Sequence, residues 1–188
     1  MPSQTEKVSV ICHSQRTISL IQHISTLAIG VPANAAEHPS ESAPSEAVVH
    51  SSLETAIQNV APGFFGFIPK YEALLGHLLD DRIKALEELH QSPSKVFFPV
   101  RKYIICSKEL PPQGMARPET VPFIESFDSL IQLLERCRLA GAITTGNYHS
   151  LIRRLDGSAR NAFRRLRART DALIHENGGS CSSPTTSS

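Results

Sequence analysis

The sequence predicts a mainly α-helical fold, an irregular bundle of four to five helices with at most a short β-ribbon. Three observations predict it. Apolar residues recur at helical spacing in long segments, prolines and glycines separate these segments, and β-prone residues cluster in only two short runs. A hydrophobic fraction of 40% and a charged fraction of 20% suit a globular chain of 188 residues.

Residues 1–30 are expected to hold a strand and a helix. A β-branched run at 8–12 predicts the strand, and apolar residues at helical spacing over 16–29 predict the helix, which Gly30 ends. Residues 31–50 shift to Pro, Ala, Ser and Glu without apolar periodicity. That composition is typical of a flexible linker.

Residues 51–176 are expected to form the helical domain. A capping-box pattern at 51–54 predicts the start of a short helix that Pro62 ends. The clearest helix of the chain follows, with Pro69 at its first position. Its predicted core face comprises Tyr71, Leu74, Leu75, Leu78, Leu79, Ile83, Leu86 and Leu89.

β-prone residues return at 96–106, where a proline argues for an edge ribbon or an irregular packed segment instead of a central strand. A proline-rich loop over 110–122 precedes a helix that starts near Phe123 and ends before Gly141. Residues 177–188 are rich in Ser, Thr and Pro and are expected to be a disordered tail.

The last predicted helix, over 145–176, separates its side chains into an apolar face and an arginine-rich face. Gly157 is either tolerated within it, at about 1 kcal/mol relative to alanine, or splits it into two helices. Arginine suits bidentate contact with phosphate, and every basic residue of this helix is an arginine. Four of them, at 153, 160, 164 and 167, align on a narrow stripe opposite the apolar face. The predicted nucleic-acid-binding residues are Arg153, Arg154, Arg160, Arg164, Arg165, Arg167 and Arg169.

This pattern favours a non-catalytic protein whose arginine face binds nucleic acid, with RNA preferred and without sequence specificity. A merely solvated face, pairing with Glu87 and Glu88 inside the fold, and an acidic protein or membrane partner stay open as alternatives. The main alternative function is a helical adaptor, or a self-assembling regulatory or accessory protein, that binds through apolar helix faces. The candidate self-association residues, which we expect to be exposed on the last helix, are Phe163, Leu166 and Leu173.

The sequence predicts neither a catalytic site nor a metal or cofactor. Cys12 and His13 are adjacent, and neighbouring residues on a strand point to opposite faces, so their spacing indicates no catalytic dyad. His77 and Asp81 share a helix face but supply only half of a metal site. Without a signal-peptide pattern or a long apolar span, a cytoplasmic location is expected. The basic run at 164–169 also fits a nuclear localisation patch.

Overall fold

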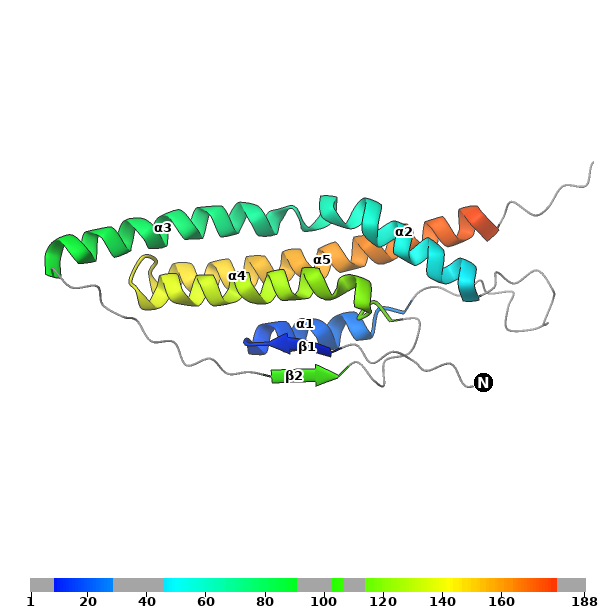
Figure 1. Ribbon diagram of the computed structural model, residues 1–188, viewed down its shortest axis with the longest axis horizontal. Coiled ribbons are helices and arrows are strands. Elements are labelled where there is room, and N and C mark those ends of the chain that lie inside the picture. The colour runs from blue at the N-terminus through cyan, green and yellow to red at the C-terminus, as the bar shows by residue number, and fades with distance from the viewer. Residues whose placement is uncertain (1–8, 29–45, 91–102, 107–113, 179–188) are drawn as a thin grey trace, which may run out of the picture.

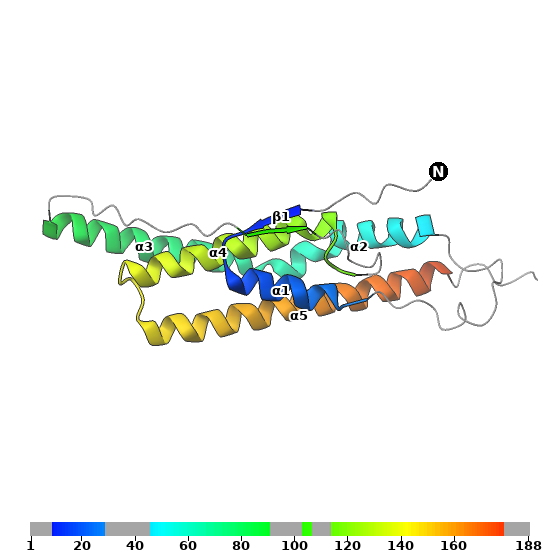
Figure 2. The same cartoon turned by 90° about the horizontal axis from the view of Figure 1, so that it is seen from below.

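The computed structural model describes residues 9–28, 46–90, 103–106 and 114–178, and it confirms a mainly α-helical, irregular bundle (Figures 1 and 2). Its helices are α1 (Gln15–Ser25), α2 (Glu46–Phe65), α3 (Phe67–His90), α4 (Val121–Leu139) and α5 (Thr145–Gly178). Its strands are β1 (Ser9–Cys12) and β2 (Tyr103–Cys106), and a single 3-10 turn, η2 (Pro118–Thr120), precedes α4.

The long helices run lengthwise in an elongated bundle. α4 and α5 form an antiparallel hairpin, α3 lies along α4, and α2 lies along the C-terminal half of α5 (Figure 1). The hairpin turns at Gly141, whose φ of 71° is a left-handed conformation that favours glycine. From α3, Arg82 Nε donates to the Ala140 carbonyl at 3.1 Å and so caps the end of α4.

The N-terminal strand and helix belong to the same core as the rest of the bundle. α1 packs against α4 and α5, and Leu20 and Ile24 are fully buried there. β1 and β2 form a two-stranded antiparallel ribbon in which Ser9 lies opposite Cys106. This ribbon confirms the short β-element. The remainder of the β-prone run, residues 96–102, lies outside the described residues.

The predicted bounds of the second helix were wrong at both ends. α2 begins at Glu46, so residues 46–50 of the expected linker are helical and the pattern at 51–54 lies inside the helix. The helix also continues through Pro62 to Phe65. A proline inside a helix removes one backbone hydrogen bond, but Pro62 is exposed, and burial of Phe65 offsets the loss. Residues 31–45 of the expected linker and 179–188 of the expected tail lie outside the described residues.

Aromatic contacts tie three helices together at the centre of the core. The ring of Phe65 on α2 stacks on Phe123 of α4, with ring centroids 4.5 Å apart. Its edge meets Phe163 of α5 at 4.9 Å. Such pairs are typical of aromatic packing and add to the free energy gained by burying the rings.

The predicted core face of α3 was only partly right. Leu75 and Leu79 are buried, whereas Leu74, Leu78, Ile83 and Leu89 are exposed. α4 covers one side of α3 only, and the C-terminal end of α3 extends past the α4–α5 turn (Figures 1 and 2). By contrast, the apolar face of α4 is buried from Ile124 to Cys137.

Candidate nucleic-acid interface

α5 is one continuous helix of 34 residues, about 51 Å long. The Thr144 side chain accepts a hydrogen bond from the Asn147 backbone N–H at 3.2 Å and so caps the first turn. Gly157 lies inside the helix without splitting it. The arginines that the sequence places on this segment therefore share a single straight scaffold.

Of the four aligned arginines, Arg160 and Arg167 are half-buried and paired within the protein, whereas Arg153 and Arg164 are exposed. Arg160 is half-buried; its Nε donates to Asp156 Oδ2 at 2.9 Å, and its Nη2 donates to Ser19 Oγ of α1 at 3.2 Å. Arg167 is also half-buried and pairs with Asp171, with Nε and Oδ2 3.5 Å apart. These two arginines are held by contacts within the protein, so the predicted narrow stripe is not one uniform exposed surface.

Four arginines of α5 form an exposed group, which we call the outer arginines: Arg153, Arg154, Arg164 and Arg165. Within the described part of the chain, none of the four makes an ion pair. Arg153 Nε donates to the His149 carbonyl at 3.2 Å, a neutral partner. The outer arginines therefore keep their charge uncompensated at the surface.

The last arginine of α5, Arg169, has a partner within the helix, whereas Glu87 and Glu88 of α3 do not pair with α5. Arg169 is exposed and its Nη1 lies 3.4 Å from Glu176 Oε1. Glu87 and Glu88 are exposed on α3, and among the described residues neither pairs with an arginine of α5. The acidic partners that the described residues supply to these arginines, Asp156, Asp171 and Glu176, come from α5 itself and not from α3.

The outer arginines form two doublets on one side of α5. Eleven residues separate Arg153 from Arg164 and Arg154 from Arg165, which is three turns of helix, or about 16.5 Å. Gly157 and Asn161 lie on the exposed side between the doublets and carry no charge. This side of α5 is therefore a straight, positively charged surface without bulky side chains at its centre.

Helix α1 packs against α5 beside this surface. Burial, and then the neighbouring Arg160 and Arg164 guanidinium groups, hold the pKa of His23 below its ordinary value, although Asp156 partly opposes them. His23 Nε2 is buried and has no hydrogen-bond partner among the described residues.

The candidate self-association residues do not lie on the surface of the single chain. Phe163 and Leu166 are fully buried in the core, and Leu173 is half-buried. The expectation that Phe163 and Leu166 are exposed was wrong because α2 lies along this part of α5 and covers it.

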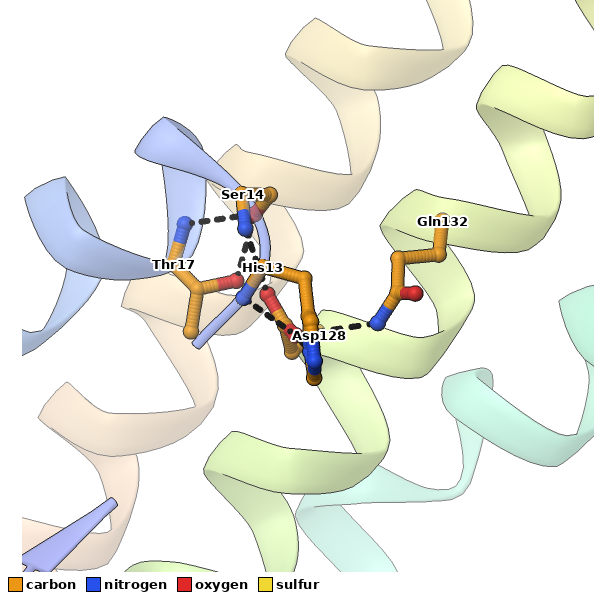
Figure 3. A network of polar contacts seen from close by, with 5 residues as sticks. All are labelled: His13, Ser14, Thr17, Asp128 and Gln132. Atoms are coloured by element: carbon orange, nitrogen blue, oxygen red, sulfur yellow. Dashed lines mark hydrogen bonds and ion pairs between the residues drawn. The ribbon is translucent and has the colours of Figure 1, made fainter. Parts of the chain in front are cut away.

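A buried carboxylate on α4, which the sequence analysis missed, anchors α1 in the bundle (Figure 3). Asp128 of α4 accepts hydrogen bonds from the backbone N–H groups of His13 and Ser14 at 2.8 and 3.0 Å, and its Oδ2 lies 2.9 Å from His13 Nδ1. Gln132 Nε2 also donates to it at 3.1 Å. Asp128 thus satisfies backbone donors just before the first turn of α1, where Ser14 itself caps Thr17.

The charge state of this network follows from its contacts. Burial alone would raise the pKa of the Asp128 carboxyl, but hydrogen bonds from Thr17, His13 and Ser14 together hold it below its ordinary value. Burial, with Asp128 and Glu125 nearby, raises the pKa of the Cys12 thiol to about 11. Cys12 is therefore a neutral thiol at physiological pH, and the network holds the fold together instead of activating a nucleophile.

The only sequence signal for a buried Asp128 is its position among apolar residues. It lies four residues after Ile124 and three before Ile131, inside the apolar stripe of its helix. A lone carboxylate at such a position is buried only when donors meet it. Those donors come from residues 13 and 14, more than a hundred positions away, so helical spacing alone did not reveal them.

Three further observations concern metal sites, membrane-spanning helices and similarity to known proteins. Across the described ranges, no three His, Cys, Asp or Glu side chains gather closely enough to hold a metal ion. No described helix combines the length and the apolar character that crossing a membrane requires. Comparison with known protein families, curated proteins and solved structures finds no match for this chain.

Proposed function

We propose that this protein is a non-catalytic binding protein whose outer arginines contact the phosphate backbone of nucleic acid, with RNA preferred, without reading its sequence. The observation that carries the proposal is the exposure of Arg153, Arg154, Arg164 and Arg165 without any ion pair in the described part of the chain. An arginine already paired with a carboxylate must lose that ion pair to bind phosphate, whereas these four have no ion pair with the described residues to lose.

The chemistry of the surface suits phosphate. A guanidinium group donates two parallel hydrogen bonds to one phosphate, and its charge displaces counterions from the nucleic acid. The straight helix holds the two doublets about 16.5 Å apart, so several phosphates can be contacted without ordering a flexible loop. Uncharged Gly157 and Asn161 between the doublets leave room for a backbone to approach closely.

The same surface supports binding without sequence specificity. Along the exposed side of α5 between the doublets no aromatic side chain is present on which a base would stack. Contacts to phosphate position a nucleic acid but carry no direct sequence information. The expected partner is therefore recognised through its backbone charge.

The test is fluorescence anisotropy of the full chain with labelled RNA over a series of salt concentrations. Four phosphate contacts predict a slope of log affinity against log salt of about −3.6 for a duplex and about −2.8 for a single strand. The variant in which all four outer arginines become glutamate is expected to lose binding, with circular dichroism confirming that it still folds. No binding by the wild-type chain at low salt would refute the proposal.

A matched pair of single variants distinguishes loss of the α5 surface from a mere change in the protein's net charge. Arg165→Glu and Lys70→Glu make the same charge change at exposed helical positions, one on α5 and one on α3. Arg165→Glu is expected to weaken binding to all sequences alike and to reduce the salt slope by about 1. Lys70→Glu should leave the slope unchanged, and equal effects of the two variants would contradict a site on α5.

A further inference from the structure

One side of α3 carries a row of apolar residues, which we call the outer seam: the exposed Leu74, Leu78 and Leu89 and the half-buried Ala85. At about 100° per residue, these four positions fall within an arc of about 60°, next to the buried positions Leu75 and Leu79. The three leucines are 52%, 37% and 72% exposed. Single exposed leucines are ordinary, but a row of them along one helix is typical of a surface that binds something.

The three leucines of the outer seam are accessible to solvent. Arg82 caps the last carbonyls of α4, so the last eight residues of α3 lie beyond the end of that helix. Figures 1 and 2 both show this end of α3 extending past the α4–α5 turn. Neither the packing of α4 nor the hairpin turn blocks a second helix from lying along the seam.

The seam is complementary to itself when two copies run antiparallel. A twofold axis between Asp81 and Arg82 places Leu74 opposite the second copy's Leu89, and Leu78 opposite the second copy's Ala85. Each large side chain near the axis thus meets a small one, which permits close approach of the two helices. A twofold interface requires this reciprocal pattern, in which residue i meets j and j meets i.

The charges along one edge of the seam match the same antiparallel arrangement. His77, Asp81, Lys84 and Glu88 are all exposed and lie together on the side of the seam away from the core. Around the axis, two Asp81 carboxylates and two Lys84 ammonium groups form a cluster with no net charge. Further out, Glu88 of each copy lies beside His77 of the other. In a parallel twofold pair, these charged edges would instead lie on opposite sides of the interface, so the charges of the two copies could not pair with each other.

From this pattern we propose that the outer seam of α3 is a self-association surface, on which a second copy of the chain packs antiparallel about an axis between Asp81 and Arg82. The surface shares no residue with the outer arginines, so the proposal is independent of nucleic-acid binding. One helix pair over residues 74–89 is about 24 Å long and buries less than the roughly 1,200 Å² of a stable interface. The dimer is therefore weak and forms only at high protein concentration.

Sedimentation equilibrium of the full chain without nucleic acid, from micromolar to millimolar concentration, tests the proposal. The wild-type chain is expected to pass from monomer to dimer. Asp81→Lys gathers four ammonium groups around the axis and should raise the dimer dissociation constant about tenfold or more. The double variant Asp81→Lys with Lys84→Asp restores the neutral cluster and should restore the dimer.

A second variant tests the apolar part of the seam. Leu89→Asp changes the most exposed leucine of α3, so the monomer should keep its thermal stability while the dimer is lost. A chain that stays monomeric at every concentration overturns the proposal. A dimer that neither Asp81→Lys nor Leu89→Asp weakens also overturns it, because that dimer would use another surface.

Discussion

Replacing Asp128 with alanine tests how the N-terminal helix is held in the bundle. The substitution removes the acceptor for the backbone N–H groups of His13 and Ser14, the His13 ring and the Gln132 amide. The ring and the amide can turn toward water, but the two backbone donors are fixed before the first turn of α1. In the variant, these two half-buried donors have lost their carboxylate acceptor.

The expected loss follows from those two donors. Leaving one buried donor without an acceptor costs about 1–3 kcal/mol. Since His13 and Ser14 are half-buried, water reaches them in part, and the free energy of unfolding should fall by about 2–4 kcal/mol. Domains are stable by only about 5–15 kcal/mol, so this is a large fraction of the total.

Urea denaturation followed by circular dichroism measures the loss. The unfolding midpoint should fall while the slope with urea stays unchanged, because the same surface is exposed on unfolding. Glu125→Ala removes a carboxylate from an exposed position of the same helix and should change stability by no more than about 0.5 kcal/mol. An Asp128→Ala loss no larger than that of Glu125→Ala would refute the anchoring role.

The pH dependence of stability provides a second test of the role of Asp128. Because the folded-state pKa of Asp128 is held below its ordinary value of 3.8, its contribution is complete well above that pH. The contribution is lost as the pH falls through 3.8 and then through the folded pKa, since the carboxylate becomes protonated. The stability difference between wild type and Asp128→Ala should therefore be full at neutral pH and narrow in acid.

Three other changes follow from the structure. Gly157→Ala should stabilise the protein by about 1 kcal/mol, because a Cβ there meets no atom within 4 Å in a helix interior; a rise in the thermal midpoint of about 2–4 °C would show it. Phe163→Ala should cost about 3–5 kcal/mol in urea denaturation, as expected of a buried ring that contacts Phe65; a loss below about 1 kcal/mol would contradict its place in the core. Since the folded pKa of His23 lies below its ordinary value of 6.5, its unfolded form takes up a proton first and stability falls as the pH drops below 6.5. Urea midpoints at two pH values on either side should show a smaller drop in His23→Gln than in wild type.

Local patterns predicted the elements but not all of their bounds. Apolar spacing identified α3, α4 and α5, and the β-prone runs identified both strands of the ribbon. The same reasoning failed at α2, where a linker-like composition and Pro62 argued for a shorter helix. Burial of Leu53, Ala61 and Phe65 stabilises that helix, and burial is a tertiary effect that local propensity does not contain.

The exposure of individual side chains was the least predictable feature. Leu74 and Leu75 are equally apolar neighbours, yet only Leu75 is buried, because α4 covers one side of α3. Phe163 was expected on the surface and lies in the core, because α2 covers that part of α5. A helical wheel shows which residues share a face, but not which faces another helix will cover.

For the arginine face, the sequence alone determined that seven arginines lie in one segment of helical period, whose apolar residues share another face. That conclusion needs only the helical period. The tertiary structure decided which of them are available: Arg160 is held by Asp156 and α1, whereas the outer arginines are exposed and make no ion pair with the described residues. The physical reason is that charge is a property of a residue, but its compensation depends on neighbours that only folding brings together.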